Sequence, residues 1–355
     1  MRKSRLCSVL AAGLAAAISV NSHAAPKSDF SVCWTIYAGW MPWEYGAAEG
    51  IVDKWAKKYD INIDVVQIND YVESINQYSA GQFDGCTMTN MDALTIPAAG
   101  GVDSTALIIG DFSNGNDGVV LKGEKKTLGD LKGQNVNLVE LSVSHYLLAR
   151  GLEKAGLSEK DLKVVNTSDA DMVAAFSTSD VTAVTTWNPL LAEIEATPNV
   201  TKVFDSSQIP GEIIDLMVVN SDTLKDNPAF GKALTGAWYE IMATMSADTP
   251  AGKAAREHMA KASGTDLAGY EAQLAATKMF YSAKDAVAFA TSPKLPATMT
   301  KVAEFSFGHG LLGEGAQSSD AIGMSFAKDV TTGDSGNLKL RFDPSYMQMA
   351  ADGTL

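Results

Sequence analysis

The chain has 355 residues, of which 46% are hydrophobic and 20% are charged, a composition that excludes a disordered or fibrous protein. Lys and Arg total 28 against 42 Asp and Glu, so a net charge of −14 leaves no broad basic surface for nucleic acid. At the usual size of about 150 residues per domain, this length predicts two lobes.

The N-terminus has the pattern of a secretory signal peptide. Basic residues within positions 1–5 precede an apolar stretch over residues 6–20, and Ser22-His23-Ala24 carries small residues where a signal peptidase reads them. We predict a signal peptide over residues 1–24. The apolar stretch is too short to span a membrane, and no run of about 18 apolar residues follows, so we expect a soluble protein of the periplasm.

Two cysteines, Cys33 and Cys86, remain after the predicted cleavage site. In an oxidising compartment, such a pair is a candidate disulfide. Both residues also lie in apolar, strand-like segments, where a free cysteine behaves as a small buried hydrophobe. Both alternatives stay open, because the spacing does not fix the geometry that a disulfide requires.

Strand and helix patterns alternate along the first half of the mature chain, which is typical of an α/β fold with mainly parallel sheets and helices on both faces. The first set comprises strands at 31–36, 61–68, 85–89 and 107–110, with helices over 42–55 and 71–80. The turn-rich segment 111–118 is interpreted as a crossover to a second set.

The second set contains strands at 119–122, 135–139, 162–165, 181–186 and 201–204, with helices at 144–154 and 170–176 and after Asn188-Pro189. A strand at 213–219 returns the chain to the first lobe, and helical patterns follow at 230–245, 251–262, 267–279 and 298–305. We therefore predict lobe I over residues 25–117 and 215–355, and lobe II over residues 118–214.

Residues beyond the carboxyl ends of these strands are expected to bind a ligand, because ligands of open α/β sheets lie there. Residues 141–157, which include Ser142 and His145, resemble the Ser-x-x-His helix start of periplasmic binding proteins for nitrate, sulfonate and taurine importers. The strand that ends in Trp187-Asn188-Pro189 is similar to the Trp-x-Pro motif of the same family.

Two further segments, residues 39–46 and Thr89-Asn90-Met91-Asp92-Ala93, resemble the branch of these binding proteins that is associated with urea carboxylase genes. The resemblance implies a two-lobed, type II periplasmic binding protein with a helical C-terminal extension. It also implies that the protein captures urea, guanidine or a related small nitrogen compound for the membrane permease of an ABC importer. We expect a monomer with no cofactor and no metal.

The charges of the candidate cleft segments favour a cation over an anion. These segments contain five acids and no Lys or Arg, the acids being Glu44, Asp92, Asp111, Asp117 and Glu140. They also hold Trp40, Trp43 and Trp187, and aromatic faces attract planar cations. Carboxylates can receive the coplanar N–H groups of a guanidinium in paired hydrogen bonds. An anion would instead need basic groups or a free helix N-terminus.

The predicted ligand-binding set is Trp43, Glu44, Asn90, Asp92, Asp111, Glu140, Ser142, Ser144, His145, Trp187 and Asn188. Each residue also has an ordinary structural interpretation, since Trp fills cores, Ser caps helices and Asp forms turns. Their joint placement on separate strand ends favours ligand binding. The two lobes are expected to close by hinge bending near residues 112–118 and 207–215.

The sequence lacks the usual signatures of an enzyme. The histidines at positions 145, 258 and 309 do not have zinc-binding spacing, and no nucleophile elbow, P-loop or dinucleotide-binding motif is found. A related fold hosts pyrimidine-synthesising enzymes, and fold alone does not settle function. An exported enzyme, a periplasmic sensor and a binding protein for sulfonate, nitrate or taurine therefore stay as alternatives.

Overall fold

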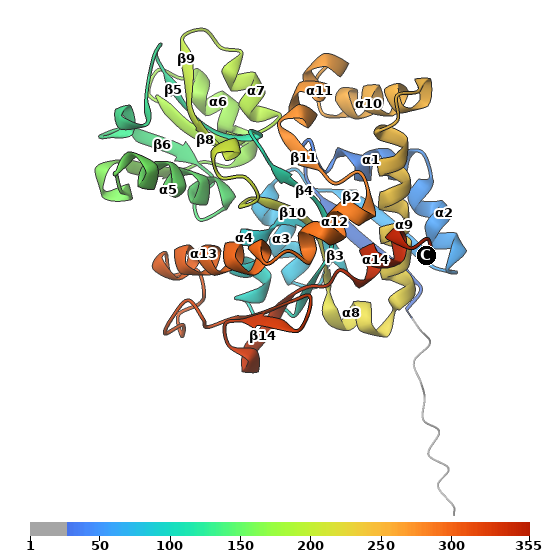
Figure 1. The fold of residues 1–355 in the computed structure, drawn as a ribbon. Coiled ribbons are helices and arrows are strands. Elements are labelled where there is room, and N and C mark those ends of the chain that lie inside the picture. Colours follow the sequence, from blue (N-terminus) through green and yellow to red (C-terminus); the bar gives the residue numbers. More distant parts are fainter. Residues whose placement is uncertain (1–26) are drawn as a thin grey trace, which may run out of the picture.

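The structure, a computed structural model, describes residues 27–355, which form two β-sheets flanked by helices (Figure 1). The predicted signal peptide, residues 1–24, lies outside the described residues. Among residues 27–355, none of the helices combines the length and the apolar character that a membrane crossing needs. The predicted α/β class, with sheets covered by helices on both faces, is confirmed.

The larger sheet takes strands from both ends of the described chain. Its nine strands within residues 27–355 are β1 (Asp29–Trp34), β2 (Asn62–Gln67), β3 (Gly85–Thr89), β4 (Ser104–Ser113), β10 (Ile214–Asn220), β11 (Thr277–Met279), β12 (Gly323–Phe326), β13 (Val330–Thr332) and β14 (Leu338–Phe342). Their order is β13-β12-β14-β4-β10-β3-β1-β2, and β11 pairs with β4. Strand β10 is antiparallel to both β3 and β4, whereas β1 is parallel to β2 and β3.

A disulfide joins Cys33 of β1 to Cys86 of β3. The two residues are direct partners in the parallel register, their Cα atoms are 4.4 Å apart, and neither side chain is exposed. The bond therefore ties together two central strands of the larger sheet.

The smaller sheet is built from one continuous part of the chain. Its strands are β5 (Asp117–Lys122), β6 (Asn135–Leu138), β7 (Lys163–Asn166), β8 (Ala183–Trp187) and β9 (Val200–Asp205), in the order β7-β6-β8-β5-β9. The chain crosses between the sheets twice, through residues 114–116 and through residues 206–213.

The first crossover is shorter than the turn-rich segment 111–118 predicts. Asp111 belongs to β4 and pairs with Asp215 of β10, and Asp117 belongs to β5 and pairs with Trp187 of β8. Pairing with neighbouring strands therefore overrides the local turn preference of these aspartates.

Helices cover both sheets. Those beside the larger sheet are α1 (Met41–Ala48), α2 (Ile51–Lys58), α3 (Tyr71–Ser79), α4 (Asn90–Ala93), α8 (Ser221–Asp226), α9 (Pro228–Met245), α10 (Pro250–Ala262), α11 (Leu267–Ala275), α12 (Ala283–Ala290), α13 (Lys294–Gly308) and α14 (Ser345–Ala351), and those of the smaller sheet are α5 (Val143–Ala155), α6 (Met172–Ser177) and α7 (Leu190–Glu195). Short helical turns are η1 (Leu94–Ala98), η2 (Leu128–Leu131), η3 (Glu159–Asp161), η4 (Asp169–Asp171), η5 (Ser206–Gln208) and η6 (Ser335–Asn337).

Two predicted helices differ from the structure. The helix expected over residues 42–55 is divided into α1 and α2, because Gly50 adopts a left-handed conformation with φ of 69°. The helix expected over residues 267–279 ends at Ala275, and the following residues pair with β4 as β11. Both differences arise where tertiary contacts or a glycine interrupt an otherwise helical pattern.

Helix α13 lies between the two sheets' helices and contacts both. Its Met299 side chain lies 3.4 Å from the amide nitrogen of Asn90 in α4, and its Phe305 ring packs edge-on against Tyr146 of α5 with ring centres 5.2 Å apart. Figure 1 shows α13 running alongside α5. A C-terminal helix of the larger unit thus also touches the smaller one.

Candidate functional site

A small cavity lies where the two sheets meet. Its wall combines residues of the larger sheet's side with residues of the smaller sheet's side. The lining residues are Tyr37, Trp40, Tyr71, Thr89, Ile213 and Asp215 from the former, and Asp117, Val143 and Trp187 from the latter. None of these nine described residues is Lys, Arg or His.

Four aromatic rings form a continuous wall around the cavity. Tyr37 and Trp40 follow β1, and their ring centres are 5.1 Å apart. The Trp40 and Tyr71 rings are 5.7 Å apart, and Tyr71 meets Trp187 edge-on at 5.5 Å. Because the faces of such rings carry negative charge density, this wall favours a cation in the cavity.

Three buried aspartates come from three strands. Asp117 of β5 and Asp215 of β10 line the cavity, whereas the predicted site residue Asp111 of β4 does not line it and pairs with Asp215. The hydroxyl of Tyr37 donates a hydrogen bond to Asp111 at 3.2 Å. Asp111 and Asp215 are direct partners in the antiparallel pairing of β4 with β10, so each carboxyl group influences the pKa of the other.

Burial dominates the protonation of these groups. Loss of water raises the pKa of Asp117 to about 7, even though its hydrogen bond with Ser113 acts in the opposite direction. Burial and the negative charge of Asp111 hold the pKa of Asp215 well above its usual range. The site is thus a low-dielectric pocket in which burial favours the protonated form of the carboxyl groups.

A fourth carboxylate, Asp92, lies beside the cavity at the N-terminus of α5. It accepts hydrogen bonds from the hydroxyls of Tyr71 at 2.7 Å and Thr89 at 2.8 Å. Burial raises the pKa of Asp92 to about 6, and these hydroxyls and the backbone N–H of Val143 act in the opposite direction. Asp92 therefore supplies a negative charge at a helix N-terminus, where anions usually bind.

Several other predicted site residues lie close to this cavity. Trp187 lines it, and Ser142 caps the N-terminus of α5 by accepting a hydrogen bond from the backbone N–H of Ser144. The Ser144 side chain is fully buried, and its hydroxyl makes no hydrogen bond within the described residues. Asn188 donates a hydrogen bond to Asn116 in the first crossover.

The remaining predicted residues do not line the cavity. Trp43 packs on Trp238 with ring centres 5.1 Å apart, and Glu44 is 2.9 Å from Nε2 of His258. Asn90 accepts a hydrogen bond from the backbone N–H of Ile214. Two more residues lie on the smaller unit: Glu140 is exposed, and His145 contacts Glu159.

A family model described as NMT1/THI5 like matches residues 55–248, which is more than half of the chain. The chain belongs to this family. This NMT1/THI5-like protein has the two-lobed fold of periplasmic binding proteins, as its likeness to solved structures shows. The match covers all of the smaller sheet and the strands that carry Asp111 and Asp215.

The relatives of this NMT1/THI5-like protein include named binding proteins. A Brucella abortus (strain 2308) protein named as a binding protein is 31% identical to this chain over 103 residues. The matched segment covers 29% of this chain and 31% of the relative. The alkanesulfonate-binding protein SsuA from Xanthomonas axonopodis pv. citri, bound to MOPS, has a TM-score of 0.66 at 17% identity and covers 82% of this chain and 96% of its own. The periplasmic nitrate-binding protein NrtA from Synechocystis PCC 6803 has a TM-score of 0.57 at 12% identity, with 93% of this chain and 100% of its own covered.

Of the ligand-binding set predicted for this NMT1/THI5-like protein, only Trp187 is among the lining residues. Four lining residues, Tyr37, Tyr71, Ile213 and Asp215, lay outside all candidate cleft segments. Asp215 could have been noticed as a lone carboxylate inside the apolar strand predicted at 213–219. Tyr37 follows the first strand directly, at the usual place for a ligand-binding residue. Tyr71 begins a helix, and only the folded structure shows that its hydroxyl reaches Asp92.

Proposed function

We propose that this protein is the periplasmic solute-binding component of an ABC importer and that it captures a small nitrogen cation of the guanidine type. The ligand binds in the cavity between lobe I, residues 25–117 and 215–355, and lobe II, residues 118–214. A signal peptide over residues 1–24 directs export, and a membrane permease receives the ligand from a monomeric, non-enzymatic carrier. The family membership and the two-lobed fold support this assignment.

The observation that carries the choice of ligand is the set of buried carboxyl groups in an aromatic cavity. Asp111, Asp117 and Asp215 are at most 3% exposed, and none of the lining residues in the described chain is basic. Buried carboxylates are costly unless a positive charge pairs with them. A guanidinium offers N–H donors in one plane, which suits carboxylates at its edge and indole or phenol rings at its faces.

An anionic ligand is the second candidate, because the Xanthomonas structure is that of an alkanesulfonate-binding protein and the Synechocystis structure is that of a nitrate-binding protein. The contacts of Asp92 argue against it. In this chain, the first N–H of α5 faces the protein's own carboxylate, so an added sulfonate would lie beside a negative charge. Like charges at that distance repel strongly in a buried site.

Titration calorimetry on the mature protein with guanidinium, urea, taurine and nitrate tests the proposal. We expect guanidinium to bind and both anions to show no heat, with urea weaker because it carries no charge. Asp117→Asn keeps the size and most of the hydrogen bonding of this side chain while removing its charge. We expect it to weaken guanidinium by at least about tenfold, equivalent to about 1.4 kcal/mol.

Glu44→Gln is the matched control, since Glu44 is paired with His258 away from the cavity and its substitution should leave the affinity unchanged. Tight binding of taurine or nitrate by the wild type would refute the proposed ligand class. Equal losses for guanidinium and urea in Asp117→Asn would remove the argument from charge.

A further inference from the structure

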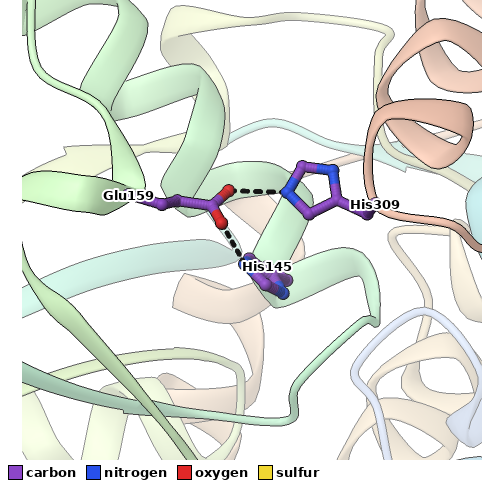
Figure 2. A group of neighbouring side chains, drawn as sticks. All are labelled: His145, Glu159 and His309. Carbon is purple, nitrogen blue, oxygen red and sulfur yellow. Dashed lines mark hydrogen bonds and ion pairs between the residues drawn. The ribbon is translucent and has the colours of Figure 1, made fainter.

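A cluster of two histidines and one glutamate lies outside the cavity, where α13 meets the smaller unit. In Figure 2, the Glu159 carboxylate lies between the two imidazole rings. Nε2 of His309 is 2.8 Å from one carboxylate oxygen, and Nε2 of His145 is 3.2 Å from the other. His145 lies in the first turn of α5 and Glu159 begins η3, whereas His309 directly follows α13. The cluster thus connects two parts of the chain that belong to different lobes of the proposed carrier.

The hydrogen bonds of His309 define its charge. Its Nδ1 lies 2.8 Å from the carbonyl oxygen of Phe305, and its Nε2 faces the Glu159 carboxylate. Both neighbours are acceptors, and a neutral imidazole has only one N–H to donate. Both bonds are satisfied together only when His309 is an imidazolium. The ring also lies at the C-terminus of α13, where the helix dipole favours a positive charge.

Two histidines and a glutamate can bind zinc in other proteins. Here, a hydrogen bond from the backbone to His145 makes zinc binding unfavourable. The backbone N–H of Leu141 donates to Nδ1 of His145 at 3.1 Å. The proton of neutral His145 is therefore on Nε2, the atom that faces Glu159 and that a metal would need unprotonated. The arrangement fits a carboxylate that accepts a hydrogen bond from His309 and has Nε2 of His145 close to its other oxygen.

We propose that protonated His309 and Glu159 form a pH-dependent latch that holds the two lobes closed. This inference rests on the proposed binding-protein function, because it assumes that the lobes open and close. The partner carboxylate is ready for this role, since the hydrogen bond from His145 and those from His309 lower the pKa of Glu159 to about 2. Glu159 is thus ionised at every pH at which histidine changes its charge.

Neighbouring contacts between α13 and α5 support the same closed arrangement. Phe305 packs against both His145 and Tyr146, and Lys301 is 3.4 Å from Glu212, which also pairs with Arg150 of α5. These ion pairs add contacts between α13, the second crossover and α5 that do not involve a histidine. Within the described chain, the ionisable side chains that contact His309 directly are Glu159 and His145.

The latch can be tested without a ligand, by measuring the distance between the lobes. Cysteines introduced at the exposed positions Lys57 and Ser179 would carry fluorophores, and the buried Cys33–Cys86 disulfide would not react. Single-molecule energy transfer then gives the ratio of closed to open molecules. At pH 5.5 we expect this ratio to be roughly fivefold higher in the wild type than in His309→Gln, and the two to converge at pH 8.5.

Two further variants sharpen the result. Glu159→Gln should behave like His309→Gln, because it removes the other charge of the pair. His258→Gln removes a histidine that pairs with Glu44 within one lobe, so it should behave like the wild type. A wild-type-to-variant ratio that does not change with pH overturns the latch. If zinc closes the wild type at pH 8.5 but not His309→Gln, the cluster is a metal site and the latch is likewise overturned.

These outcomes are separable from the proposed ligand. A working latch in a protein that does not bind guanidinium would refute only the ligand class. A protein that binds guanidinium normally but shows no difference between wild type and His309→Gln would refute only the latch.

Discussion

Asp117 and Asp215 approach the cavity from different sheets, and neither has a basic side chain as its partner in the described residues. Burial therefore favours the protonated form of each carboxyl group in the empty site. A site of this kind exchanges a proton for its ligand. This exchange of a proton for a ligand should affect two measurable quantities, the affinity for the ligand and the stability of the empty protein.

The first consequence concerns the affinity for a cation. Because the pKa of Asp117 is about 7 in the empty site and a bound cation favours the ionised form, binding should release a proton below this pH. We expect the affinity for guanidinium to rise with pH by up to about tenfold per unit between pH 5 and 7, and then to level off. Calorimetry in buffers of different ionisation heat measures the proton release directly, and a flat profile would contradict the prediction.

The second consequence concerns stability. The pKa of Asp117 is about 7 when folded, well above the value of about 3.9 for an unfolded chain, so the folded state holds the extra proton between these values. The stability that this group contributes is present below pH 4 and is lost as the pH rises towards 7. Asp117→Asn should therefore stabilise the empty protein at pH 8 by on the order of 2–4 kcal/mol, with little effect at pH 4.

Urea unfolding of the ligand-free protein at the two pH values provides the measurement. A variant that is less stable than the wild type at pH 8 would show that the carboxylate has a favourable partner when folded. The same substitution is expected to weaken ligand binding. Asp117 would therefore strengthen ligand binding while lowering the free energy of unfolding of the empty protein.

At the scale of elements, the sequence was most informative where apolar patterns are strong. The strand predicted at 85–89 matches β3, and the helix predicted at 144–154 matches α5 within one residue at each end. The antiparallel pairing of β10 with β4 could not be predicted, because it depends on contacts between residues about a hundred positions apart. That pairing is what brings Asp215 against Asp111.

The short strands β12 and β13 were also not predicted, because they carry few apolar residues and gain their order from pairing with β14 and with each other. Residues of the candidate site were likewise predicted where the local pattern was strong and missed where their position depends on tertiary contacts. Trp187 lies at the end of a clear strand and was predicted, whereas Tyr71 reaches the cavity only through the packing of α3. The local sequence pattern thus identified the cavity residue at a strand end, Trp187, but not Tyr71, whose position depends on tertiary packing.

The disulfide between β1 and β3 is expected to stabilise the larger sheet mainly through the unfolded chain. It closes a loop with a sequence separation of 53 residues, for which loss of loop-closure entropy predicts about 4 kcal/mol as an upper value. The double substitution Cys33→Ala and Cys86→Ala should lower the free energy of unfolding by about 2–4 kcal/mol. Chemical denaturation measures this change, and added reductant should leave the variant unaffected while weakening the wild type. An unchanged midpoint would contradict the prediction.

For the whole molecule, the two crossovers at residues 114–116 and 206–213 are the places where the lobes of the proposed carrier can bend. The cavity takes residues from both lobes, so a ligand that contacts all of them favours the closed form. At pH 8, where the proposed latch is released, saturating guanidinium should reduce the radius of gyration in X-ray scattering. Asp117→Asn should need at least about tenfold more guanidinium for the same change. Identical curves for the wild type with and without ligand would contradict hinge closure.

The carboxylate of Asp92 at the start of α5 also gives a way of sorting sequences. A helix N-terminus that the chain neutralises with its own acid has no use for an anionic ligand, whereas one left open attracts such a ligand. If the proposed cation site is correct, an acid at the position that aligns with Asp92, three places after the strand-ending Thr89, should accompany a cationic ligand in other binding proteins. Binding assays on relatives with and without an acid at this position would test that rule.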